Sequence, residues 1–138
     1  MMTRPRNERG SMSIELVLLT PILVACILVI AGGARHVDAR GQTSTAAFVA
    51  ARAASLTSDQ EAAVAAGRKA ASGALADRGL ACVSLTVQID AGDFRPGGHI
   101  RATVTCTADL SDLSGLGLPG TKSFTSVAVV PIEEHRVL

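Results

Sequence analysis

The apolar run LVLLTPILVACILVIAGGA, from Leu16 to Ala34, decides how this chain is organised. It contains nineteen residues and no formal charge. At about 1.5 Å per residue, a helix of this length spans roughly 28 Å, which is close to the hydrocarbon thickness of a bilayer. The preceding segment is polar and basic, which favours a cytoplasmic N-terminus; its cations are Arg4, Arg6 and Arg9. The run therefore predicts a single membrane-spanning helix, with the C-terminal region outside the cytoplasm.

Hydropathy alone allows three interpretations of this segment. The first is a secretory signal, cleaved near the small residues Gly32 to Ala34. The second is a plain single-span anchor. In the third, a basic leader is removed after Gly10 and the apolar helix stays in the mature protein. The three interpretations predict different N-termini for the mature chain.

Glu15, at the start of the apolar segment, favours the third interpretation. A carboxylate carried to the bilayer centre costs about 3 kcal/mol, so such residues tend to have a function. Cleavage between Gly10 and Ser11 makes Glu15 the fifth residue of the mature protein. Glycine before the cut, a small residue after it and glutamate at the fifth position together form the type IV prepilin signature. In a bundle of such helices, Glu15 of one subunit can pair with the new α-amine of its neighbour.

The composition argues against an enzyme. Aromatic residues make up only 2% of the chain, and the sequence has no Trp and no Tyr, although aromatic rings normally fill much of an enzyme core. The net charge of +1 gives no electrostatic reason to expect a nucleic acid. The three histidines lack metal-ligand spacing. We expect no catalytic residue, no metal site and no cofactor.

Two Ala-rich helical stretches follow the apolar run. Residues 37–56, VDARGQTSTAAFVAARAASL, are compatible with a continuation of the membrane helix. Ser58 and Glu61 have capping-box spacing, which predicts Ser58 as the N-cap of a second helix that ends at Gly79. Within the membrane helix, Pro21 should produce a kink or a local loosening.

After Gly79 the apolar period changes from helical to two. Two alternating stretches, residues 83–89 and 100–106, flank the turn-rich AGDFRPGG and predict a β-hairpin. A third strand is predicted from Lys122 to Val130, ended by Pro131. The fold class is therefore α+β, with about three antiparallel strands. The predicted segments are a leader (1–10), a transmembrane helix (11–36), extracytoplasmic Ala-rich helices (37–79) and a small antiparallel β-domain (80–138).

Matching the apolar faces of the hairpin pairs Ile89 with Ile100 and Val83 with Cys106. In this register Cys82 points to the opposite face from Cys106, so a regular cross-strand bridge is not predicted. A bulge, or a position of Cys82 just before the strand, would allow the bridge. We predict a Cys82–Cys106 disulfide, which would stabilise the fold by about 3–4 kcal/mol by closing its loop and would require an oxidising compartment.

The run RGSMSIELVLLTP, from Arg9 to Pro21, resembles the start of TadE-like proteins, which are minor pilins (pseudopilins) of the tight-adherence, or Flp-type, type IV pilus system. The resemblance continues through ARAASLTSDQEAAVAAGRKA and CVSLTVQID to ATVTCTADLSDLSGLGLPG. Over these segments the sequence is similar to the actinobacterial branch of the family. Leu16 stands where family members often have an aromatic residue. Leu16 and the long C-terminal part favour an accessory pilin over the main fibre subunit.

The resemblance implies cleavage by a membrane aspartyl prepilin peptidase between Gly10 and Ser11, with Glu15 as the carboxylate at position five of the mature protein. It also implies partners: other pilins, pilus-assembly membrane proteins and membrane lipid. The protein would either enter the fibre or prime its assembly. Two alternatives remain open: an anchored envelope protein with an extracytoplasmic binding domain, and a secreted protein with an ordinary signal peptide.

Overall fold

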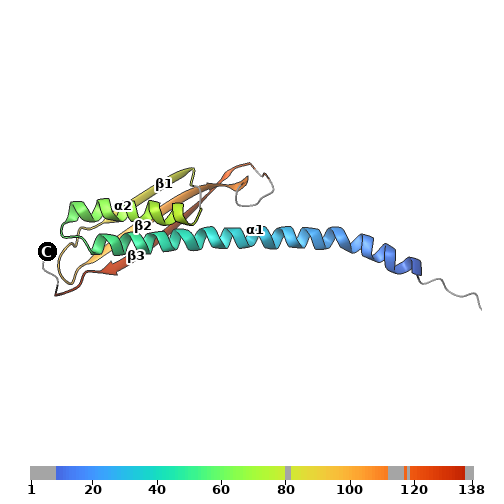
Figure 1. Ribbon diagram of the computed structural model, residues 1–138, viewed down its shortest axis with the longest axis horizontal. Helices are drawn as coiled ribbons and strands as arrows, with labels where there is room; N and C mark the ends of the chain where they lie inside the picture. The colour runs from blue at the N-terminus through green and yellow to red at the C-terminus, as the bar shows by residue number, and fades with distance from the viewer. Residues whose placement is uncertain (1–8, 80–81, 112–116, 118, 136–138) are drawn as a thin grey trace, which may run out of the picture.

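The computed structural model describes residues 9–79, 82–111, 117 and 119–135, with side chains from Ser13 onward. Its elements, in chain order, are α1 (Arg9–Ser55), α2 (Gln60–Asp77), β1 (Ser84–Asp90), β2 (His99–Asp109) and β3 (Thr121–Pro131). Figure 1 shows a small head, built from α2, the sheet and the C-terminal part of α1, from which the rest of α1 projects as a long rod. The predicted α+β class is confirmed.

Helix α1 runs without interruption for 47 residues. The predicted continuation of the membrane helix into the Ala-rich stretch is therefore confirmed. Pro21 lies inside α1 and does not end it; the helix curves gently in its N-terminal part (Figure 1). The apolar side chains of this part are exposed on all sides of the helix, Val29 at 75% for example. Among the described residues, α1 is the one helix long and apolar enough to cross a membrane.

The core of the head lies between the two helices and one face of the sheet. Helices α1 and α2 are antiparallel and pack side by side through small residues, among them Ala47, Ala50 and Ala51 on α1 and Ala71 on α2. Alanine side chains let the helix axes approach closely, but each buries little apolar surface. A core of this kind gains less from the hydrophobic effect than one filled with Leu and Phe, so it depends more on covalent and capping interactions.

The start of α2 differs from the prediction by one residue. The N-cap is Asp59, whose side chain accepts a hydrogen bond from the Ala62 backbone N–H at 2.8 Å. The predicted N-cap, Ser58, is therefore wrong. Because an extended backbone is required at the N-cap, the choice between adjacent cap formers depends on where the connection from α1 becomes extended, and this happens at Asp59 (φ −144°, ψ 165°). The predicted end is confirmed, with Gly79 in the left-handed region at φ 71°.

Replacing Asp59 with alanine is expected to lower the free energy of unfolding by about 1 kcal/mol, because the Ala62 N–H loses its acceptor. Ser58→Ala is the matched control and should leave the free energy nearly unchanged. Urea denaturation of both variants, followed by circular dichroism, measures the difference. A larger loss in the Ser58 variant would contradict the observed cap.

The three strands form one antiparallel sheet in the order β1-β2-β3. Leu85 pairs with Cys106, Val87 with Val104 and Ile89 with Ala102, so the predicted register is wrong by two residues. A shift of two keeps every side chain on its face, so the alternation of the sequence does not distinguish the two registers. The connection from Ala91 to Gly98 sets the register instead. It leaves Ile100 free to pack against Ala54, Ala63 and Ile132 beyond the end of β1.

Strand β3 extends one residue further at each end than predicted and includes Pro131 as its last residue. Proline is allowed here because β3 is at the edge of the sheet and pairs only with β2, so no strand on its other side needs the missing N–H. The face of the sheet away from the helices is mostly polar, apart from the exposed Val127 and Val129 on β3. Hydroxyl pairs cross from β2 to β3 on it, Thr105 to Thr125 at 3.1 Å and Thr107 to Ser123 at 2.9 Å.

Candidate functional site

The predicted cleavage point lies at the very start of α1. The helix begins at Arg9, so Gly10 and Ser11 are in its first turn. The first four N–H groups of a helix have no intrahelical acceptor, so this turn is the easiest part of α1 to open. Cleavage there would leave the apolar run and the head intact. The side chain of Ser11 lies outside the described set.

Glu15 lies one turn further along α1, with an exposed side chain between exposed Ile14 and Leu16. The ion pairs found among the described side chains are both in the head and do not include Glu15. The hydroxyl of Thr20, five residues further on, is satisfied within the helix, since Thr20 Oγ1 donates to the Leu16 carbonyl at 2.7 Å. Glu15 is thus a carboxylate on an otherwise apolar, outward-facing surface.

The predicted disulfide between Cys82 and Cys106 is present, with Cα atoms 5.4 Å apart. Cys82 lies just before β1, outside the regular ladder, which is the arrangement that allows the bridge. Its neighbour Val83 still donates to the Thr107 carbonyl at 2.7 Å, which holds the chain against β2. Cys106 is fully buried on the core face, so the bridge ties the start of β1 to the centre of the head. Cys26 is free and exposed on α1.

The head begins close to the end of the apolar run. The His36 ring packs against Phe124 of β3, with ring centroids 5.1 Å apart. One turn later, Ala39 packs with Phe124 and Ala108. Since the apolar run ends at Ala34, only a few residues separate it from the first contact with the sheet. The head would therefore sit directly at the surface of any membrane that α1 crosses.

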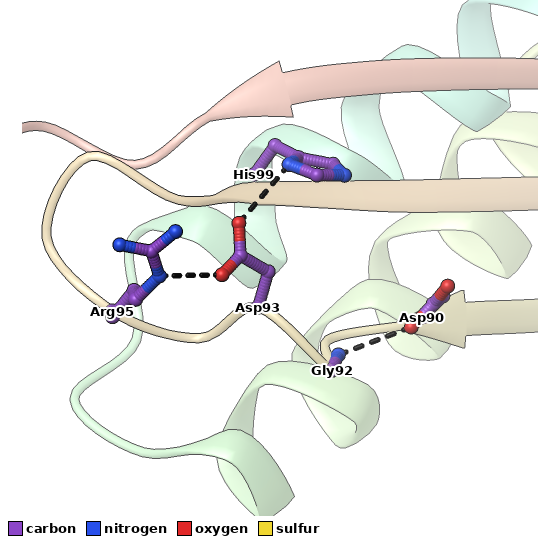
Figure 2. A network of polar contacts seen from close by, with 5 residues as sticks. All are labelled: Asp90, Gly92, Asp93, Arg95 and His99. Carbon is purple, nitrogen blue, oxygen red and sulfur yellow. Dashed lines mark hydrogen bonds and ion pairs between the residues drawn. The ribbon is translucent and has the colours of Figure 1, made fainter.

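A polar network closes the loop between β1 and β2 at the opposite end of the head (Figure 2). Arg95 Nε donates to Asp93 Oδ1 at 2.6 Å, and His99 Nδ1 lies 3.2 Å from Asp93 Oδ2. The hydrogen bond from Arg95, together with the charges of Arg95 and His99, lowers the pKa of Asp93 below its usual value. The Gly92 N–H donates to Asp90 Oδ1 in the same loop. Arg95 and His99 are largely exposed and Asp93 is partly exposed, and their contacts stabilise the turn between β1 and β2.

A second carboxylate is held at the other end of β2. The backbone N–H and the hydroxyl of Ser111 both donate to Asp109 Oδ1 at 2.8 Å, and these hydrogen bonds lower the pKa of Asp109. Across the described part of the chain, no group of three or more His, Cys, Asp or Glu side chains could hold a metal ion. The candidate functional element is therefore α1 itself, with its Glu15 carboxylate and the head that it carries.

Several contacts within the head, and between the head and α1, were not predicted from the sequence. They include the His36–Phe124 ring contact, the Asp93 network and the close approach of Gly67 to its neighbours. For Gly67 a signal exists, since a glycine in the middle of an Ala-rich helix lowers helix stability unless it serves packing. The other two join residues far apart in the chain or within an irregular loop, where periodicity carries no information.

The fold and these features define an α+β protein with a long, exposed N-terminal apolar helix and a small disulfide-linked head. Residues 10–52 match the family model described as TadE-like protein, which confirms the resemblance over this region. The match begins at Gly10, includes Glu15 and the whole apolar run, and ends where α1 packs against the head. At family level it links the chain to the tight-adherence pilus system. No curated protein and no solved structure matches the chain.

Proposed function

We propose that this protein is a minor pilin, or pseudopilin, that takes part in assembly of a tight-adherence type IV pilus after a prepilin peptidase cuts between Gly10 and Ser11. The observation that carries the proposal is the TadE-like match, which starts at Gly10 and covers the apolar helix together with Glu15. The helix geometry supports it, because the cut falls in the first turn of α1 and leaves the rest of the helix continuous.

The arrangement of the molecule in the membrane follows from this proposal. The apolar part of α1 spans the bilayer, the basic leader stays in the cytoplasm, and the head lies outside. The disulfide supports an extracytoplasmic head, since disulfides persist in oxidising compartments and are rare in the cytosol. The exposure of apolar side chains all round the helix supports insertion, because lipid is the surrounding that such a surface requires.

Glu15 has a specific role in the proposed mechanism. Cleavage creates a charged α-amine on Ser11, next to an apolar helix. When the helices of neighbouring pilins pack together, Glu15 of one subunit pairs with the α-amine of the next. Attraction between opposite charges is much stronger in such a low-dielectric bundle than in water. The pair offsets the cost of desolvating both charges and sets the axial position of one subunit against its neighbour.

The processing step is tested by the N-terminus of the mature protein. The full chain is expressed with a prepilin peptidase and without one, and the membrane fraction is analysed by N-terminal mass spectrometry. We expect a start at Ser11 only when the peptidase is present, and loss of cleavage in Gly10→Val. Gly33→Val is the matched control, since a Cβ at Gly33 meets no atom within 4 Å. It should be cleaved normally.

Other outcomes of this experiment overturn the proposal. A mature protein that starts near Arg35, with processing blocked by Gly33→Val, would identify a secreted protein with an ordinary signal peptide. An intact leader in the presence of the peptidase would identify a plain anchor. The pairing role is tested separately with Glu15→Gln, which should be cleaved but lose co-purification with other pilins. Glu61→Gln, an exposed carboxylate on α2, is its control; unchanged co-purification in Glu15→Gln would exclude the pairing.

A further inference from the structure

The end of the β2–β3 hairpin points back towards the apolar part of α1. Strand β2 runs antiparallel to α1, because Ile100 packs with Ala54 near the end of the helix whereas Ala108 packs with Ala39. The hairpin therefore leads from the far end of the head towards the segment that would enter a membrane. Figure 1 shows this end reaching alongside α1, past the rest of the head.

The position of the hairpin end along α1 follows from the contacts. Phe124 is level with His36 and Ala39, and it pairs with Cys106. The two strands remain paired for three more residues, to Asp109 and Thr121, which adds roughly 10 Å. This distance equals about six residues of helix, which places the last pair roughly level with the end of the apolar run. If α1 were tilted by about 20° in the membrane, a point about 10 Å from the helix axis would move by only about 3 Å along the membrane normal.

The side chains at this end suit a headgroup layer. Lys122 is exposed and lies two residues before Phe124, which packs on α1. Its long apolar stem can lie along acyl chains while its ammonium reaches lipid phosphates. The one described carboxylate next to it on β2, Asp109, accepts two hydrogen bonds from Ser111. Pro119, which is exposed, adds apolar surface near the hairpin end, whereas Leu110 is partly buried against the cluster of Ala39, Ala108 and Phe124.

We infer that the β2–β3 end of the head rests on the phospholipid headgroup layer of the membrane that α1 crosses, with Lys122 on the lipid phosphates. This inference rests on the membrane-spanning role of α1 in the proposed function. The contact gives the protein a second attachment to the membrane, which fixes the rotation of the head about α1. Entry of the subunit into a fibre then requires this contact to break.

The absence of Trp and Tyr from the sequence allows a direct test, because one introduced Trp is the only strong fluorophore. The full chain carries a single Trp at Thr121, at Glu133 on the far end of the head, or at Val29 within the apolar run. Each variant is reconstituted in vesicles of phosphatidylcholine and phosphatidylglycerol whose acyl chains are brominated at a shallow or a deep position. Bromine quenches Trp fluorescence at short range.

We expect Val29→Trp to be quenched more by deep bromines, Thr121→Trp to be quenched more by shallow bromines, and Glu133→Trp to be unaffected. If Thr121→Trp is quenched no more than Glu133→Trp while Val29→Trp is quenched, the head does not touch the lipid and the inference is wrong, although α1 is inserted. If Val29→Trp is not quenched, α1 is not in the bilayer, and the proposed membrane helix fails together with the inference.

The role of Lys122 is tested in the Thr121→Trp background. Removing one cation at an anionic surface should shift the ratio of docked to undocked heads by about fivefold, so Lys122→Ala should weaken shallow quenching and Lys69→Ala, an exposed lysine on α2, should not. The effect of Lys122→Ala should disappear in vesicles of phosphatidylcholine at high salt. Equal quenching with and without Lys122 would exclude the phosphate contact.

Discussion

Replacing Cys82 and Cys106 together with serine is expected to lower the free energy of unfolding of the head by about 3–4 kcal/mol. The bridge joins residues 24 positions apart, and its loss returns the entropy of this loop to the unfolded chain. For a head of this size the change corresponds to a fall of roughly 15 °C or more in the melting temperature. The loss is large compared with the total stability of a small domain.

The composition of the core makes this effect severe. Most of its buried positions on the helices are alanines, which bury little apolar area on folding. On β2, the core residues that precede Cys106 on the same face are Val104 and Ala102. Cys106 is itself part of this core, so its replacement also places a hydroxyl in an apolar position, which adds to the loss.

Thermal and urea denaturation of the full chain in detergent, followed by circular dichroism, measures the change. Cys26→Ala is the matched control, because Cys26 is exposed on the apolar part of α1 and is not bonded. Treatment of the unchanged protein with a reductant should reproduce most of the effect. If the double variant unfolds at the same point as Cys26→Ala, the bridge does not contribute to the stability of the head.

Replacing Gly67 with leucine is expected to destabilise the head by about 3 kcal/mol, or to separate α2 from the sheet. A Cβ at Gly67 would lie 2.7 Å from Ile89 Cδ1 and 3.2 Å from the Ala50 carbonyl oxygen. The Ile89 side chain can rotate away, but the Ala50 backbone belongs to α1 and cannot. Because Gly67 lies where α1, α2 and β1 meet, a larger side chain forces these three elements apart.

Gly73→Ala, on the same helix, is the control for this prediction. A Cβ at Gly73 meets no atom within 4 Å, so alanine there should raise the free energy of unfolding by up to about 1 kcal/mol through helix propensity alone. The same denaturation measurement compares the two variants. Destabilisation of similar size at both positions would show that helix propensity, and not close packing at Gly67, controls the stability of α2.

The two ends of α2 differ in how well they could be predicted from the sequence. The capping-box spacing located the start of the helix but chose Ser58 over the adjacent Asp59. Adjacent cap formers differ only in which of them has an extended backbone, and that depends on the path of the chain from α1. The left-handed Gly79 was predicted because only glycine adopts this conformation without steric cost.

The parts of this protein that depend on local patterns were determined by the sequence. The apolar run, its continuation into α1, the second helix and the alternating strands all follow from periods of 3.6 or two along the chain. The proposed processing site at Gly10 and Ser11 and the proposed role of Glu15 were predicted in the same way, from residue types at fixed spacing near the N-terminus. The family match over residues 10–52 covers Gly10, Glu15, the apolar run and most of α1, but not the second helix or the strands.

Only the tertiary structure decided how these parts meet. It set the pairing of Leu85 with Cys106, placed Cys82 just before β1 and brought Gly67 against Ala50 and Ile89. It also placed the end of the β2–β3 hairpin near the level at which the apolar run ends. The physical reason is that a register shift of two residues leaves every side chain on its face, so local alternation does not distinguish the registers. Loop length and the fit of the core across distant segments make that choice.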